Sequence, residues 1–419
     1  MIARQVESPA GSETTKNKQN ADAGRFNQNR NESNRQHHWD AFRAVLMLLG
    51  IPYHVALTYR TGQVWILDAR EGMAGLSELA EFIHLFRMPA FFVIAGYFSA
   101  LLLARRAPWQ WLRGRLFRLG IPLAVAMLTL NPLLNMACEL SGLPAAEAVQ
   151  SWLRNSAESG GYWVRHLWFL IVLLYYSLAA SLLVWRLPAL ANARVSPRRD
   201  ALLARWFLPF WLGLAMLFGL WEAVSIELFY KAGLATNLPQ QILRIDETLQ
   251  YLPWFLLGWL MAQAPAFHAR LYRLSPVIVI TAATFTALAI RYGPVLWPPY
   301  GRFLATVAGL CLTQVALVLL RRVASQPSAS VRSLVDASFV VYLFHLPILA
   351  GLVVLMQPLA MPVALKAALV ALLTFLLSWG CWAAVSRSPL LRLLYDGVRT
   401  KPGRTTRAQR PLVVSVIRS

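Results

Sequence analysis

The sequence predicts an all-α integral membrane protein, a polytopic bundle of about ten transmembrane helices with both termini in the cytoplasm. Three observations support this fold class. Hydrophobic residues make up 57% of the 419 residues and charged residues only 14%, whereas a soluble domain carries about 25% charged residues. The apolar residues form runs that approach the length needed to cross about 30 Å of hydrocarbon. The basic residues, which leave a net charge of +21, lie mostly between those runs.

Taken in order, the apolar runs predict ten membrane-spanning helices within one membrane domain, residues 39–395. The spans cover residues 42–59, 83–103, 116–136, 167–185, 206–226, 249–263, 276–290, 302–320, 338–356 and 363–385. The sixth and seventh are short for a bilayer. The segment 1–38 is polar, has no apolar stretch of signal-peptide length, and predicts a disordered cytoplasmic tail. Residues 396–419 predict a basic cytoplasmic tail.

The distribution of Lys and Arg predicts the orientation of the bundle, because these residues resist translocation when they lie near the ends of spans. Of the forty, twenty-eight lie in the two tails and in alternate loops. Eight lie in the intervening loops or at their boundary with a span, and these loops also carry ten carboxylates. Four lie further inside spans. Both termini are therefore expected in the cytoplasm, where the basic C-terminal tail suits anionic lipid. A nucleic-acid partner is not expected, since the basic residues are divided among short loops.

The three cysteines, Cys138, Cys311 and Cys381, lie in or beside apolar runs and have no paired spacing. Such scattered thiols predict neither a disulfide framework nor a metal site, and we assign them to packing. No bound metal or cofactor is expected.

Two ionisable residues share one face of the first span. Arg43 and His54 are eleven residues apart, which corresponds on a helix to about three turns and a rise of about 16 Å. Ionisable groups inside a membrane usually face the bundle interior or a watery cavity. Pro52 removes a backbone donor next to His54, and a loosened helix needs other protein or water around it. Two structural interpretations stay open, in which Arg43 reaches the lipid headgroups and His54 is a packing residue.

Other polar side chains are expected at successive depths in the membrane, along the same path as Arg43 and His54. Arg113, Arg115 and Arg118 lie where the third span enters from the cytoplasmic side. Polar aromatic and basic residues lie at mid-membrane and toward the outer side, namely His84, Arg87, His166, Trp168, Tyr342 and His345. Together they indicate a conduit through the bundle. For His84, His166 and His345 a purely structural role is equally open.

These residues carry a resemblance to the membrane-bound acyltransferase-3 family. The spacing of Arg43 and His54 and the segments RMPAFFVIAGYF, RGRLFRLGIP and YLFHLP occur in the order expected of that family. The resemblance covers about residues 39–395. Ala95 departs from it, because the family commonly has Ser there, so no chemistry is assigned to that position. Glu222, in the middle of the fifth span, matches no motif, and we interpret it as a local ion-pair partner.

Within the family, the run WDAFRAVLMLLGIPYHVALTY and the segment HLWFL look most like members that succinylate osmoregulated periplasmic glucans. The resemblance implies a membrane-bound O-acyltransferase of the bacterial inner membrane. Its donor would be cytoplasmic acyl-CoA, with succinyl-CoA as the expected co-substrate, and its acceptor a hydroxyl of a periplasmic glucan. Membrane lipid and other glucan-synthesis proteins are the remaining implied partners.

The chemistry of such a transfer matches the sorted residues. Coenzyme A carries several phosphate charges, so the donor needs a basic entrance, for which Arg113, Arg115 and Arg118 are candidates along with Arg43. A sugar hydroxyl is a weak nucleophile at neutral pH and needs a positioned base, which we predict to be His54. An Arg, a His or a Tyr hydroxyl could stabilise the oxyanion that forms on the thioester carbonyl. Direct attack by the sugar is the simpler route, and an acyl-histidine intermediate stays open.

Two other functions compete with this interpretation. The first is acyl transfer to another envelope glycan, such as O-acetylation, since the spacing of Arg43 and His54 does not encode the acyl group or the acceptor. The second is a glucan transporter or an ion-coupled transporter, because histidines and broken helices at mid-membrane also suit transport. Consumption of acyl-CoA would separate an enzyme from a transporter.

Overall fold

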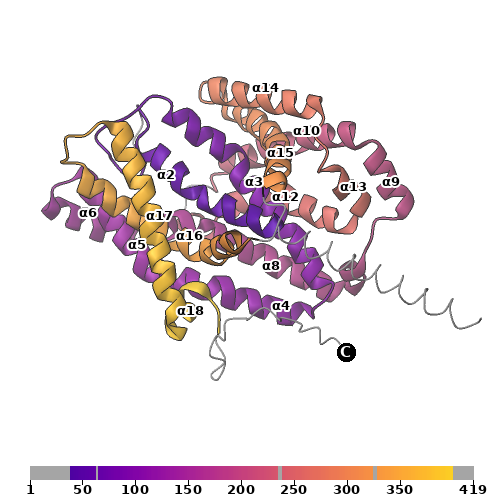
Figure 1. Ribbon diagram of the computed structural model, residues 1–419, viewed down its shortest axis with the longest axis horizontal. Coiled ribbons are helices and arrows are strands. Elements are labelled where there is room, and N and C mark those ends of the chain that lie inside the picture. The colour runs from indigo at the N-terminus through magenta and orange to yellow at the C-terminus, as the bar shows by residue number, and fades with distance from the viewer. Residues whose placement is uncertain (1–37, 63–64, 235–237, 324–327, 400–419) are drawn as a thin grey trace, which may run out of the picture.

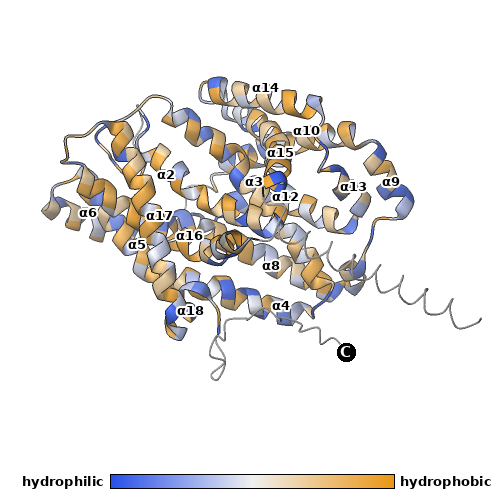
Figure 2. Ribbon diagram, viewed as in Figure 1, coloured by the Kyte–Doolittle hydropathy of each residue, from blue (hydrophilic) through white to orange (hydrophobic). Residues whose placement is uncertain are grey.

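The computed structural model describes residues 38–62, 65–234, 238–323 and 328–399, and the regular structure of these segments is helical apart from one isolated bridge between Arg60 and Met73 (Figure 1). Most of both predicted tails, 1–38 and 396–419, lies outside the described residues. The chain forms a bundle of long helices joined by shorter ones (Figure 1). The long helices are mostly apolar, whereas the short helix α9 (Pro197–Arg205) is prominently hydrophilic (Figure 2).

Within the described residues, eight helical segments are long and apolar enough to cross a membrane. They are His38–Thr58, Leu76–Leu103, Pro108–Gly142, Gly160–Arg186, Phe207–Lys231, Pro298–Val323, Val331–Met356 and Val363–Arg387. The sixth and seventh predicted spans are helices as well, α12 (Ile245–Gln263) and α14 (Pro276–Tyr292). Neither of them combines the length with the apolarity of a membrane-spanning helix. The multi-pass bundle is therefore confirmed, and the count of ten stays a prediction.

The helices that form the spans and their connections have the following bounds. The long ones are α3 (Leu76–Leu103), α5 (Ile121–Gly142), α8 (Trp168–Arg186), α10 (Phe207–Lys231), α15 (Pro298–Val323), α16 (Ala329–Met356) and α17 (Val363–Arg387). The short ones are α2 (Gly50–Thr58), α4 (Pro108–Arg115), α6 (Ala145–Glu158), α7 (Gly160–Val164), α11 (Leu238–Leu243), α13 (Pro265–Arg270) and α18 (Pro389–Asp396). A π-helix η1 (Leu116–Gly120) joins α4 to α5, and the 3₁₀ segments are η2 (Arg165–Leu167) and η3 (Pro188–Asn192).

Proline interrupts two of the helices that carry predicted site residues, whereas α3 and α16 continue through Pro89 and Pro347. The first span is broken at Leu49, because Pro52 has no N–H to donate to the carbonyl of Leu48. The π-helix η1, which contains Arg118, precedes Pro122, which likewise leaves the carbonyl of Arg118 without its helical partner. The loosened helix that the sequence predicts near His54 is confirmed.

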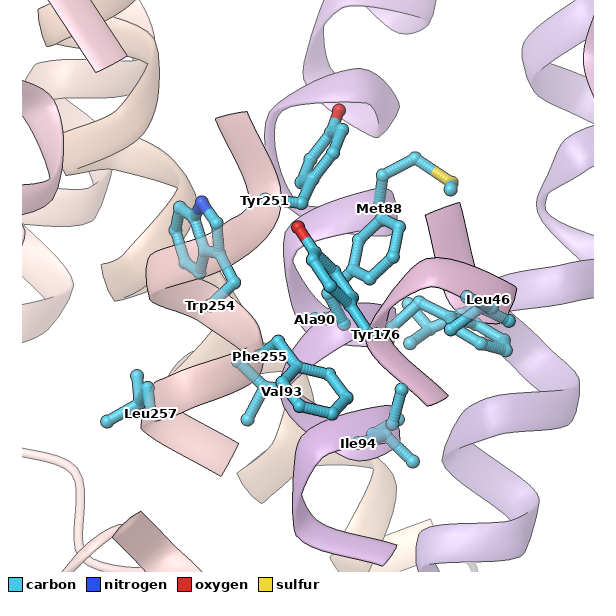
Figure 3. Close-up of a cluster of buried hydrophobic side chains, with 14 of the residues drawn as sticks. Leu46, Met88, Ala90, Val93, Ile94, Tyr176, Tyr251, Trp254, Phe255 and Leu257 are labelled. Atoms are coloured by element: carbon cyan, nitrogen blue, oxygen red, sulfur yellow. The ribbon is translucent and has the colours of Figure 1, made fainter. Parts of the chain in front are cut away.

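Helix α3 packs closely against α12 (Figure 3). A Cβ atom at Gly96 would overlap the carbonyl of Phe255, and one at Gly258 would overlap the carbonyl of Val93. The two glycines therefore let the helix backbones touch, as small residues do in membrane helix pairs. Figure 3 shows Tyr251, Trp254, Phe255 and Leu257 of α12 gathered beside Met88, Ala90, Val93 and Ile94 of α3. This contact fixes the helix that carries Arg87.

We expect Gly258→Ala to destabilise the protein by about 1–3 kcal/mol, because the added methyl group has no room against α3. Alanine raises helix propensity, so any loss must come from packing. The measurement is the midpoint of thermal unfolding in detergent. Gly213→Ala in α10 is the matched control, since nothing lies within 4 Å of a Cβ atom there. Equal midpoints for the two variants would contradict the close contact.

The loops sort into two sets that agree with the charge pattern. Loops predicted to be cytoplasmic contact one another through Val195 with Gln263, Asp200 with Ala266 and Phe267, and His38 with Tyr272. Loops predicted to lie outside contact one another through Tyr59 with Met73, Gln357 with Asp68 and Ser141, and Glu71 with the nearly fully buried Lys366. These contacts join segments that the charge pattern assigns to the same side, and the orientation of the bundle stays a prediction.

Candidate active site

Two polar cavities contain most of the predicted site residues. The arginine cavity has a volume of about 130 Å³ and is lined by Arg43, Arg115 and Arg118 among apolar side chains. The histidine cavity has a volume of about 510 Å³ and is lined by His54, His84, Arg87, Tyr162, Arg165, His166, Trp168 and Tyr342, among others. Phe169 of α8 lines both cavities and is buried between them. The two cavities are therefore neighbours separated by an aromatic side chain.

Three histidines from different elements meet at the histidine cavity. The ring of His345 on α16 lies 5.3 Å from that of His54 on α2 and 5.4 Å from that of His166 on η2, measured between centroids. Their residues are 1%, 5% and 9% exposed, respectively. In the described part of the chain, no three His, Cys, Asp or Glu side chains are grouped so as to hold a metal ion. The cluster is thus a set of three buried imidazoles, of which His54 and His166 line the cavity and His345 lies behind it.

The hydrogen bond of His345 determines which of its nitrogens carries the proton. Its Nδ1 lies 2.6 Å from the carbonyl oxygen of Tyr342. Because a carbonyl can only accept, Nδ1 carries the hydrogen and the Nε2 of the neutral ring carries a lone pair. Among the described residues, this Nε2 and both ring nitrogens of His166 are buried without a hydrogen-bond partner. Unpartnered polar atoms around one cavity are typical of a site that binds a ligand.

Arg87 of α3 also lines the histidine cavity. Its guanidinium lies 4.6 Å from the centroid of the Tyr53 ring. A Cβ atom at Gly50 would lie 2.9 Å from Nη1 of Arg87 and 3.3 Å from Nε2 of His345. A glycine at position 50 therefore leaves the space that brings this cation and this histidine together.

Strained backbone shapes the outer wall of the histidine cavity. Arg165 and Arg244 both line it and both have positive φ, 44° and 54°. Strain of this kind persists only where the surroundings hold it. Here Arg165 Nε donates to Oδ1 of Asn135 over 2.7 Å, and the Gly161 N–H donates to the side-chain oxygen of Gln241 over 3.2 Å. These contacts lock the segment that presents His166.

Several residues of this wall were not predicted from the sequence. Asn135, Gln241 and Arg244 lie far apart along the chain and belong to no recognised motif. The one available signal was Asn135, a polar residue near the end of an apolar run. Trp65 stacks on His54 with 4.9 Å between ring centroids, but an aromatic residue in an outer loop cannot be distinguished by sequence from a residue of the interfacial belt.

The arginine cavity holds three of the four arginines predicted for the donor. Arg115 Nε donates to Ser177 Oγ over 3.3 Å. Arg118 is paired with Asp396 of α18 at 2.6 Å. Arg113, in contrast, is exposed and does not line the cavity. Burial raises the pKa of the Asp396 carboxyl, and the neighbouring Arg118 acts in the opposite direction.

The structure separates Arg43 from His54. The two residues belong to one span, but Arg43 lines the arginine cavity and His54 the histidine cavity. Arg43 also lies 3.5 Å from Asp40. A rise of about 16 Å along a helix places the two side chains at different depths. The group that accompanies His54 is instead Arg87, with His166 and His345.

Both cavities fall within the part of the chain that matches a known family. Residues 36–383 match the model of the acyltransferase-3 family, described as an acyltransferase domain. The chain belongs to this family. The resemblance predicted from the sequence is therefore confirmed, and the protein is an acyltransferase of the multi-pass membrane type.

Curated relatives of this acyltransferase include the glucans biosynthesis proteins C of Salmonella paratyphi B, Salmonella dublin and Salmonella enteritidis PT4. Each is 32% identical over 327 residues, which is 75% of this chain and 82% of the relative. No solved structure matches the chain. The family resemblance thus extends across the histidine and arginine cavities alike.

Proposed function

We propose that this acyltransferase transfers a succinyl group from cytoplasmic succinyl-CoA to a hydroxyl of a periplasmic glucan. The observation that carries the proposal is the pair of neighbouring cavities, one basic and one rich in histidine, with Phe169 between them. The relatives named glucans biosynthesis protein C support a glucan as the acceptor. In this arrangement the bundle lies in the inner membrane, and the basic loops with both termini lie in the cytoplasm.

The arginine cavity suits the donor. The phosphates of coenzyme A bind Arg43, Arg115 and Arg118 at the cytoplasmic end, because guanidinium groups pair well with phosphate oxygens. The thin acyl-pantetheine arm then extends past Phe169, and the thioester carbonyl reaches the histidine cavity. Movement of the Phe169 ring is required, since this side chain is only 3% exposed.

The histidine cavity suits the reaction. A glucan hydroxyl attacks the thioester carbon while His54 accepts its proton, a C–O bond forms, and the C–S bond breaks. The departing thiolate of coenzyme A takes up that proton. We assign the base to His54 rather than His345, because His54 lines the cavity and His345 lies behind it with Nδ1 bound to Tyr342. Arg87 stabilises the oxyanion, as preorganised donors do in acyl transfer.

The test is to incubate the purified protein in liposomes with succinyl-CoA and a short β-glucan, followed by mass analysis and anion exchange of the sugar. We expect loss of succinyl-CoA and an anionic glucan heavier by one succinyl unit. If parallel assays with acetyl-CoA gave acetylated glucan and succinyl-CoA gave no product, the assignment of succinyl-CoA as the donor would be overturned. Movement of glucan across the bilayer without consumption of acyl-CoA would replace the enzyme with a transporter.

We expect Arg115→Ala to raise the KM for succinyl-CoA about tenfold and to leave the KM for glucan unchanged, because one phosphate contact is worth about 1.4 kcal/mol. Steady-state kinetics with each substrate varied in turn measures both constants. Arg106→Ala, an exposed arginine outside the cavity, is the matched control. Equal effects of Arg115→Ala on both constants would contradict a role in binding the donor.

A further inference from the structure

A third polar cavity adjoins the histidine cavity at the outer end of the bundle. It has a volume of about 810 Å³ and lies among α3, α10, α12, α14 and α15. Three carboxylates line it, Glu78, Glu81 and Glu222, and we call it the carboxylate cavity. His84 lines both this cavity and the histidine cavity. A ligand in the carboxylate cavity is therefore next to the cluster of His54, His166 and His345.

Glu222 is the buried carboxylate of this cavity, and its position is fixed by hydrogen bonds. It is 8% exposed, and its two carboxylate oxygens accept hydrogen bonds from Nε2 of Gln250 at 2.7 Å and from Oγ1 of Thr306 at 2.6 Å. Arg302, which also lines the cavity, is paired with Glu227 at 3.2 Å and not with Glu222. A carboxylate accepts about four hydrogen bonds, so Glu222 retains acceptor capacity for a ligand. The interpretation of Glu222 as an ion-pair partner is replaced by that of a fixed hydrogen-bond acceptor.

The lining selects a class of ligand. The three carboxylates outnumber the two guanidinium groups, those of Arg60 and Arg302, which disfavours an anion. These guanidinium groups and the amide of Gln250 add donors to the acceptors. Tyr230 contributes an aromatic ring to the wall. This mixture suits a neutral polyhydroxyl molecule, whose hydroxyl groups both donate and accept. The volume lies in the upper part of the range for ligand sites of about 300–1,000 Å³, which is room for several sugar rings.

We propose that the carboxylate cavity binds the neutral oligosaccharide acceptor, with Glu222 accepting hydrogen bonds from sugar hydroxyls, and that it presents one hydroxyl past His84 to the histidine cavity. This inference rests on the proposed function. It carries a consequence for the product: each succinyl group adds a carboxylate to the sugar, which Glu78, Glu81 and Glu222 repel. The cavity therefore binds the unmodified glucan in preference to the succinylated one.

The experiment measures binding of a radiolabelled neutral β-glucan oligosaccharide, and of the same sugar succinylated chemically, to the full-length protein in detergent without donor. We expect the wild type to bind the neutral sugar more tightly. Glu222→Gln should raise the Kd for the neutral sugar about tenfold, since a charge-assisted hydrogen bond becomes a neutral one. Glu81 lies at an exposed rim position, where a substitution does not put folding at risk. Glu81→Gln should reduce the preference of the protein for the neutral sugar over the succinylated one.

Glu147→Gln is the matched control, because Glu147 is exposed on α6 and outside all three cavities. The inference would be overturned if neither Glu222→Gln nor Glu81→Gln altered binding. It would also be overturned if the wild type bound no glucan, or bound both sugars equally.

The proposed function is tested separately, by the acyl-transfer assay. If transfer occurs but Kd is unchanged in the variants, only the inference fails. If binding behaves as expected but no acyl group is transferred, the cavity assignment stands and the proposed reaction falls.

Discussion

Replacement of His54 by Ala is expected to lower kcat for glucan acylation about a thousandfold while leaving the KM for succinyl-CoA within about twofold. A positioned base contributes about 10²–10⁴ to the rate, and His54 lines the histidine cavity, whereas the donor phosphates are assigned to the arginine cavity. The measurement is steady-state turnover of purified protein at matched concentrations. In cells that lack the gene, this variant should leave the periplasmic glucans neutral.

His345→Ala is the comparison that decides between the two histidines. We expect a smaller loss of kcat, because His345 is 1% exposed and packs behind His54. If His345→Ala abolished turnover and His54→Ala retained it, the base would be His345, whose Nε2 already carries a lone pair. Equal restoration of anionic glucans by wild type and His54→Ala would make His54 a packing residue. A radiolabelled acyl group trapped on the protein after removal of donor would replace direct attack with an acyl-histidine route.

Gly50→Val is expected to lower kcat about a hundredfold in a protein that still folds. The first carbon of the new side chain would lie 2.9 Å from Nη1 of Arg87 and 3.3 Å from Nε2 of His345, so both groups must move. A displacement of about 1 Å in a catalytic group can cost about 10² in rate. Kinetics and the unfolding midpoint are measured on the same preparations, since the two readouts separate a displaced site from a damaged fold.

Gly351→Val in α16 is the matched control for this substitution, because nothing lies within 4 Å of a Cβ atom at that position. It should retain wild-type kcat. Full activity of Gly50→Val would mean that neither Arg87 nor His345 needs its present position. A drop in unfolding midpoint equal to that of a core substitution would instead assign Gly50 to packing alone.

Much of the architecture could be predicted because it depends on local properties of the chain. Lipid accepts only helices with an apolar surface, so runs of apolar residues mark the helices directly. Pro52 and Pro122 remove backbone donors, and the breaks beside them follow from sequence position. Basic residues resist translocation, so their positions predict the side of each loop, and loops predicted to share a side contact one another.

The sequence by itself determined the class of fold, the family, and the residue types available for acyl transfer, because these depend on composition and on motifs that are continuous in the chain. Only the tertiary structure decided which of these residues meet. It placed Arg43 and His54 in different cavities, left Arg113 outside both, and joined His345 to His54. It also gave Glu222 fixed partners in a cavity of its own. Contacts between distant segments depend on how helices pack, and the close approach at Gly96 and Gly258 that sets this packing cannot be read from local pattern.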